Sequence, residues 1–99
     1  MNTFISMLAP LPSTYVPELR RKAWARLFGL GIRATRNEAG LSIEDAARLA
    51  GMEINEWDAI EEGHVPQETN RLRSMAAALE ISFEKLLNMV LLCREAWEL

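Results

Sequence analysis

Three glycines, Gly40, Gly51 and Gly63, divide the middle of the chain at intervals of eleven and twelve residues. Apolar residues recur at helical spacing between them, and Ser42 stands where its hydroxyl can cap the helix that follows Gly40. Helices this short cannot each bury a full face alone, so they must pack together in a compact cluster. The pattern therefore predicts an all-α fold built from short helices.

Helical patterns continue on both sides of this region. Leu19, Ala23, Leu27 and Leu30 recur on one face, and Trp24 borders it. Two nearby glycines weaken that run, so residues 18–29 are predicted to form either an additional helix or an extension of the next one. On the other side of the cluster, a helix is expected after the loop that follows Gly63. Ser82 then caps a last helix, which runs from Phe83 to about Trp97.

Residues 1–17 hold three of the four prolines, which disfavours a regular helix. We expect an extended N-terminal arm there. Its apolar content favours packing on this chain or on a partner, and disorder in solution is the alternative. The first residues lack the positive region of a secretory signal and are too short to span a membrane. A single cysteine, Cys93, excludes an internal disulfide framework and a multi-thiolate metal site. These features point to a protein of the reducing cytoplasm with no membrane partner.

Charge is unevenly distributed along the chain, although the net charge is only −3. Residues 1–36 carry six basic side chains and one acidic one, whereas residues 37–70 carry nine acidic side chains and one basic one, Arg48. Residues 71–99 carry four of each. A surface for an anionic partner such as nucleic acid must therefore draw its positive charge from the first or the last block.

Four groups of residues between position 32 and position 87 form one pattern: Ile32, Arg33, Arg36, Gly40, Leu41 and Ser42; Ala46, Ala47, Ala50, Gly51 and Met52; Trp57, Ile60, Glu61 and Gly63; and Leu72, Met75, Ala76, Ala78, Leu79, Ile81, Ser82, Leu86 and Leu87. This pattern resembles that of the lambda-repressor-like (XRE) helix-turn-helix family. The resemblance implies a five-helix DNA-binding domain over residues 30–87. Gly51 would supply the positive φ of the tight turn, and Arg36 and Glu61 would form the family's salt bridge between its first and third helices.

The resemblance also implies a double-stranded DNA operator as partner and a role as transcriptional regulator. Such proteins place the third helix in the major groove, with base contacts from the starts of the second and third helices. The DNA-contacting positions carried over to this chain, together with the nearby basic and capping residues, are Ser42, Ile43, Arg48, Ile54, Asn55, Ala59, His64 and Arg71. Asn55 could read adenine, and the two isoleucines could touch thymine methyl groups.

Acidic residues crowd the same helix and support a second interpretation. Glu53, Glu56, Asp58 and Glu62 accompany Glu61, and no basic residue lies between Arg48 and Arg71. Phosphate neutralisation supplies most non-specific affinity for DNA, so this surface would repel it. The alternative is a degenerate helix-turn-helix module, for example antitoxin-like or regulator-binding. It would hold a protein partner through its acidic third helix and bind DNA weakly or not at all.

The last helix is apolar on two adjacent sides, which requires burial on both. We therefore expect residues 88–99 to extend beyond the domain and form a homodimer interface made of Met89, Leu92, Cys93, Ala96 and Leu99. Intrachain burial under residues 1–28 is the alternative. One histidine and one cysteine give no nucleophile, base and orienting group, so we expect no enzyme activity, no cofactor and no metal site. The operator, the regulated genes and any inducing signal are left open.

Overall fold

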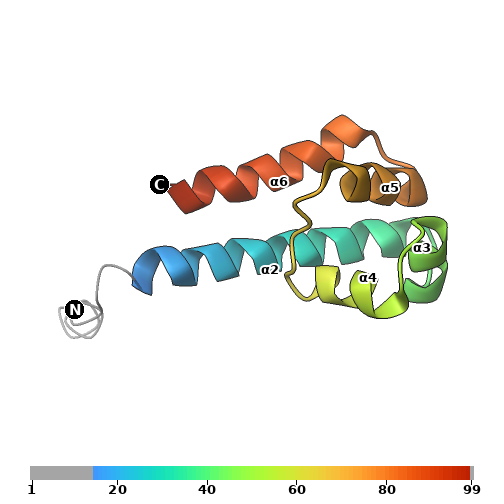
Figure 1. The fold of residues 1–99 in the computed structure, drawn as a ribbon, viewed down its shortest axis with the longest axis horizontal. Helices are drawn as coiled ribbons and strands as arrows, with labels where there is room; N and C mark the ends of the chain where they lie inside the picture. Colours follow the sequence, from blue (N-terminus) through green and yellow to red (C-terminus); the bar gives the residue numbers. More distant parts are fainter. Residues whose placement is uncertain (1–14, 99) are drawn as a thin grey trace.

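The computed structural model describes the backbone of residues 15–98 and the side chains of residues 18–92. Five helices and no strand make up this part of the chain, which confirms the all-α prediction: α2 (Tyr15–Glu38), α3 (Ile43–Leu49), α4 (Ile54–Glu61), α5 (Thr69–Leu79) and α6 (Phe83–Glu98). Helices α2 and α6 run antiparallel, and α3, α4 and α5 gather at one end of this pair (Figure 1). The longest dimension is 50 Å, against 22 and 21 Å across.

Helix α2 is one continuous helix of 24 residues, which decides between the two helices and the single helix that the sequence left open. It begins at Tyr15, so the last three residues of the predicted arm, residues 15–17, are helical. Pro17 is tolerated because it lies in the first turn, where backbone N–H groups have no partner within the helix. The rest of the arm, residues 1–14, lies outside the described residues.

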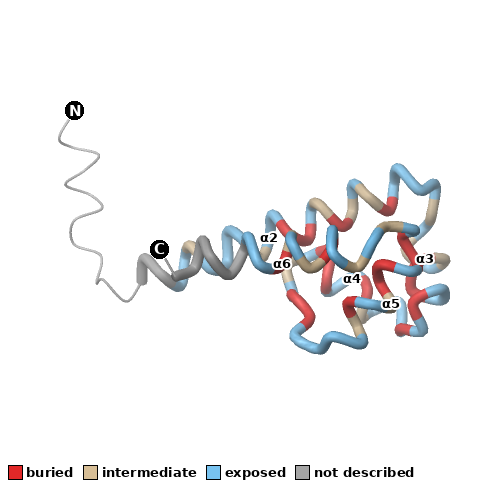
Figure 2. The backbone as a smooth tube through the Cα atoms, turned by 90° about the horizontal axis from the view of Figure 1, so that it is seen from above, coloured by how far each residue is buried: buried red, intermediate tan, exposed pale blue. Residues whose placement is uncertain are grey.

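The core draws buried residues from all five described helices, with Ala46 and Ala47 as the contribution of α3. Five large core side chains are at most 1% exposed: Trp57, Ile32, Ile60, Met75 and Leu86. Figure 2 shows that buried positions concentrate in the helical cluster, while exposed positions recur along α2. The cluster is therefore the stable body of the protein, and the first half of α2 projects from it.

Two local features set the turn between α3 and α4. The Ser42 hydroxyl accepts a hydrogen bond from the backbone N–H of Asp45 at 3.0 Å, which starts α3. Gly51 follows the end of this helix with φ of +68°, a conformation that costs a residue with a side chain about 1 kcal/mol or more. Both features have the form that the sequence predicted.

Gly29 permits a very close crossing of two helices. A Cβ atom built there would lie 2.7 Å from the carbonyl carbon of Glu61 and 2.8 Å from the carbonyl oxygen of Ile60. Helix α2 therefore packs directly on the backbone at the end of α4. Gly29 and Gly31 are the two glycines that weaken the helical pattern in the sequence, and the packing role of Gly29 emerges only from the fold.

The apolar row of Leu19, Ala23, Leu27 and Leu30 is not the buried side of α2. All four residues are exposed, whereas the core contacts come from Phe28 and Ile32 on a different side of the helix. Helix α2 thus has two apolar faces, and the domain covers one of them.

Candidate nucleic-acid interface

A buried ion pair fixes α4 against α2. The Nε of Arg36 donates to Oε2 of Glu61 at 2.6 Å, and its Nη2 donates to Oε1 at 3.1 Å, in the bidentate geometry that favours arginine. The Arg36 Nη1 also donates to the carbonyl oxygen of Leu41 at 2.8 Å. One guanidinium therefore joins α2, the turn that follows it and the end of α4. The structure brings together the two residues that the sequence paired.

Two further donors complete the environment of Glu61, and sequence reasoning missed both. The indole Nε1 of Trp57 donates to Oε2 at 2.6 Å, and the Nε of Arg33 donates to Oε1 at 3.2 Å. The spacing held a signal, because Trp57 precedes Glu61 by one helical turn and Arg33 precedes Arg36 by three residues. Glu61, 1% exposed, is thus the centre of a hydrogen-bond network and does not belong to the outer acidic surface.

This network perturbs both members of the pair. Burial disfavours the Glu61 carboxylate, but hydrogen bonds from Arg36, Trp57 and Arg33 outweigh burial and hold the pKa of Glu61 below its ordinary value. The hydrogen bond to Glu61 raises the pKa of Arg36. Both groups are therefore charged at neutral pH.

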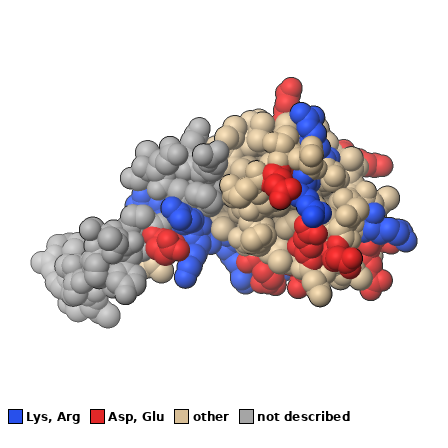
Figure 3. Space-filling view, viewed as in Figure 1, with Lys and Arg blue, Asp and Glu red and all other residues tan. Residues whose placement is uncertain are grey.

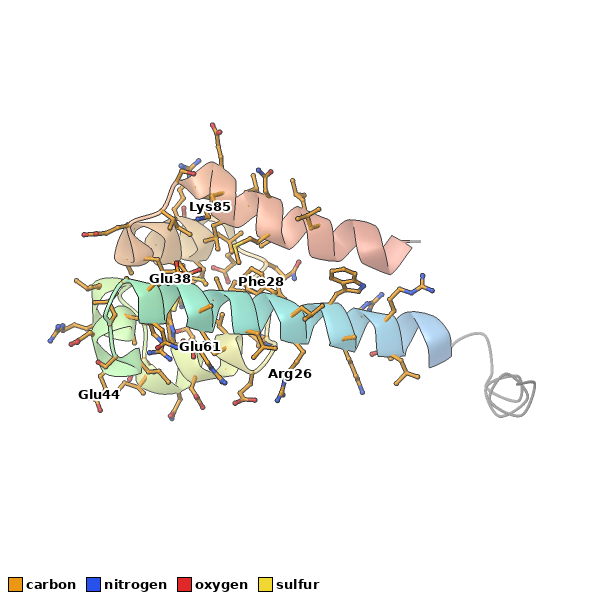
Figure 4. All side chains as sticks on the ribbon, turned by 180° about the vertical axis from the view of Figure 1, so that it is seen from behind. Arg26, Phe28, Glu38, Glu44, Glu61 and Lys85 are labelled. Carbon is orange, nitrogen blue, oxygen red and sulfur yellow. The ribbon has the colours of Figure 1, made fainter. Side chains whose placement is uncertain are left out.

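The basic residues of α2 also engage the next acidic residue. Arg26 reaches Glu62 at 3.2 Å, and Arg33 reaches the same carboxylate at 3.6 Å. Figure 4 shows Arg26 and Glu61 on one side of α2 and Phe28 between α2 and α6. Part of the positive charge of residues 1–36 is thus paired within the chain, where it neutralises the acidic residues at the end of α4.

The starts of α3 and α4 border one open groove. Four of the predicted DNA-binding residues lie together there, and a groove with a volume of about 490 Å³ is lined by Arg36, Ser42, Ile43, Glu44, Ile54, Asn55 and Asp58. Ile54 is 49% exposed, so its side chain is available to a ligand. Ala59 is also exposed, one turn beyond Asn55 on α4. The groove offers one amide and two isoleucines to a ligand, flanked by two carboxylates.

The remaining predicted residues lie away from this groove. His64 and Arg71 line a small pocket with Glu56, Ile60, Pro66 and Glu68. Arg71 forms an ion pair with Glu56 at 3.0 Å, and Arg48 forms one with Asp45 at 2.9 Å on the outer side of α3. The guanidinium of Arg73 lies 4.3 Å from the centre of the Phe83 ring. Each arginine between residues 48 and 73 already has an intramolecular partner.

Acidic side chains near the groove are less compensated. Among the described residues, Glu44, Glu53 and Asp58 have no ion-pair partner. In Figure 3, acidic side chains gather along the edge formed by α4, and basic ones gather over the first half of α2. The local potential at the groove is therefore negative, against the sign that a phosphate backbone requires.

The residues predicted for a dimer interface are only partly described. Met89 packs on α2, where its Cε would lie 3.0 Å from a Cβ built at Gly31, so it already has partners within the chain. Leu92 is 61% exposed. The side chains of Cys93, Ala96 and Leu99 lie outside the described residues. The dimer through residues 88–99 stays a prediction.

The described residues lack the features of two other kinds of site. None of the helices in residues 15–98 is long and apolar enough to cross a membrane. Among the side chains of residues 18–92, no three or more of His, Cys, Asp and Glu come together as a metal site would require.

The short helices α3 and α4 are joined by a turn at Gly51, and a buried ion pair holds α4 against the long helix α2. This arrangement defines a protein of the helix-turn-helix class. Residues 27–87 match a family described as a helix-turn-helix domain, and this match covers more than half of the chain. The chain belongs to that family. No curated protein and no solved structure gives a significant match. The matched region begins three residues before the predicted domain boundary at residue 30 and ends where the prediction ended.

Proposed function

We propose that this chain is a cytoplasmic DNA-binding transcriptional regulator of the lambda-repressor-like (XRE) type, acting as a homodimer. The groove shared by the starts of α3 and α4 carries this proposal. It gathers Ser42, Ile43, Ile54 and Asn55 on one exposed surface of a helix-turn-helix domain. A helix start offers backbone N–H groups to phosphate, and an exposed amide can form two hydrogen bonds with adenine.

The electrostatics around the groove set the strength expected of this binding. Arg48 and Arg71 exchange an intramolecular carboxylate for phosphate when DNA binds, so their net contribution is small. Glu44 and Asp58 flank the groove and oppose the phosphates. We therefore expect weak affinity with a shallow salt dependence, because few counterions are released.

The test is a selection from random duplexes at low salt, followed by fluorescence-polarisation titrations of the enriched sequence. Replacing Asn55→Ala should relax the preference at one base position and weaken binding by about 1–3 kcal/mol. Asp58→Asn should strengthen binding to all duplexes, whereas the matched control Glu84→Gln on α6 should leave it unchanged. A protein that enriches no sequence and binds no duplex even at low salt would contradict the proposal.

The unpartnered acidic residues favour a second candidate, a helix-turn-helix module that binds a basic protein segment. The contact residues would then be Glu44, Glu53 and Asp58, whose negative charge would attract the basic segment. A lysine- and arginine-rich peptide array read at physiological salt tests this function. Binding should fall when Glu44 and Asp58 are replaced by their amides and should persist in Asn55→Ala, the reverse of the DNA result.

A further inference from the structure

One side of α2 is an apolar surface that the described helices leave exposed. We define the outer stripe as Leu19, Ala23, Leu27, Leu30 and Ala34, all exposed. Leu19 is 54% exposed, Leu27 53% and Leu30 43%. Figure 4 shows that α6 is the only described helix that runs beside the first half of α2. A contiguous stripe of this kind on a small domain indicates an interaction surface.

The stripe continues onto α6. Leu27 and Trp24 line an apolar pocket together with Phe28, Met89 and Leu92. Leu92, the most exposed of the large apolar residues described, therefore borders the stripe. Part of this surface lies outside the matched helix-turn-helix region, which begins at residue 27.

The spacing of the stripe suits another helix. Ala23, Leu27, Leu30 and Ala34 follow intervals of four, three and four residues, the alternation of a two-helix seam. Among these four residues, leucines occupy the middle and alanines the two ends, so a partner helix can pack on the leucines and approach closely at the alanines. A second copy of α2 presents the same row and is complementary to it by symmetry.

Charge selects the direction of the second helix. Arg20 and Glu38 lie 18 residues apart, which is five helical turns, so they flank the same side of the stripe. An antiparallel partner centred between Leu27 and Leu30 places Arg20 of each copy beside Glu38 of the other. A parallel partner would bring together the two basic segments of residues 20–22, and these would repel.

We propose that a second copy of this chain docks antiparallel along the outer stripe of α2, with Leu27 and Leu30 at its centre and Leu92 at its edge. This inference rests on the homodimer of the proposed function and gives it a location other than the last residues of α6. The contact is built from a surface that the helix-turn-helix domain itself leaves uncovered.

Sedimentation equilibrium of the full chain without DNA is the first test. The wild type should be a dimer, and Leu27→Glu should weaken the dimer about 100-fold or more, because two leucines per dimer leave the seam. Leu49→Glu is the matched control, since Leu49 is 56% exposed on α3, away from the stripe. It should remain dimeric. Unchanged circular dichroism and thermal midpoint would show that both variants fold.

A charge exchange tests the direction. Arg20→Glu and Glu38→Arg should each weaken the dimer about two- to ten-fold, and the two changes combined in one chain should restore it. In a Cys93→Ser background, oxidation should join Ala23→Cys chains to Ala34→Cys chains in a mixture. Disulfides formed only between identical variants would overturn the antiparallel arrangement.

A wild type that sediments as a monomer, or a dimer that Leu27→Glu leaves intact, overturns the inference. These measurements contain no DNA. A dimer that binds no duplex would therefore contradict only the DNA proposal. A monomer that binds a duplex would contradict the seam and the homodimer, and the DNA-binding part of the proposed function would stand.

Discussion

Replacing Glu61 by glutamine removes one charge and keeps the size of the side chain. The amide oxygen of the substituted side chain can still accept a hydrogen bond from Trp57, but Arg36, 8% exposed, loses its counter-charge. Removing one partner of a buried ion pair costs about 3–5 kcal/mol. Domains of this size have a free energy of unfolding of about 5–15 kcal/mol, so we expect Glu61→Gln to lose a large fraction of it.

The neighbouring residue gives a matched control. Glu62→Gln makes the same chemical change one residue further along, in a side chain that is 52% exposed and bound to Arg26 and Arg33. Exposed pairs contribute about 0–1 kcal/mol, so this variant should unfold almost like the wild type.

Urea denaturation followed by circular dichroism at neutral pH measures both variants. The double variant with Arg36→Met and Glu61→Gln should lose less free energy of unfolding than the sum of the two single variants, because the second change removes the unpaired charge. A cost for Glu61→Gln within about 0.5 kcal/mol of that for Glu62→Gln would refute the reasoning that burial makes this pair decisive.

Three other predictions follow from the structure. The pKa of Glu61 is lowered in the folded protein, so the stabilising contribution of its carboxylate is present above the ordinary carboxyl pKa. This contribution is lost as the pH falls through the pKa of the folded state. The urea-derived free energies of unfolding of wild type and Glu61→Gln should therefore converge as the pH falls below about 4. Gly29→Ala should lower the free energy of unfolding by about 1–3 kcal/mol in the same assay, because the added Cβ meets backbone atoms. Gly31→Ala should be tolerated, since its Cβ meets only the flexible end of Met89. Equal losses for the two variants would contradict this reasoning. Glu80 ends α5 with φ of 57°, so Glu80→Gly should raise the thermal midpoint by relieving about 0.5–1 kcal/mol of backbone strain. Glu84→Gly within α6 is the control and should lower the midpoint. A lower midpoint for Glu80→Gly would count against the strain.

Local signals in the sequence predicted the elements that depend on short segments. Ser42 caps α3, and Gly51 turns the chain, because capping and positive φ depend on residues within one turn. The family pattern placed Arg36 opposite Glu61. Trp57 and Arg33 were missed as partners of Glu61, since their convergence requires the angle at which α2 crosses α4.

The two faces of α2 show the limit of periodicity. The exposed row with Leu27 and the buried row with Phe28 both recur at helical spacing, so the pattern alone cannot tell which one the domain covers. The fold decides it: Gly29 packs on the backbone at the end of α4, Phe28 is buried, and the row with Leu27 stays exposed. The sequence also could not tell whether the basic residues of positions 1–36 are available to an anionic partner. In the fold, Arg26 and Arg33 form ion pairs with Glu62, so these two are already engaged within the chain.

Helix α4 carries its structural and its exposed residues on separate sides. Trp57, Ile60 and Glu61 are buried, while Asn55 and Ala59 face solvent and contribute nothing to the core. Substitutions at such exposed positions change the free energy of unfolding by only about 0.5 kcal/mol. The surface of α4 can therefore drift during evolution while the scaffold persists, so that a lineage can acquire or lose a binding preference through single mutations without passing through an unfolded ancestor.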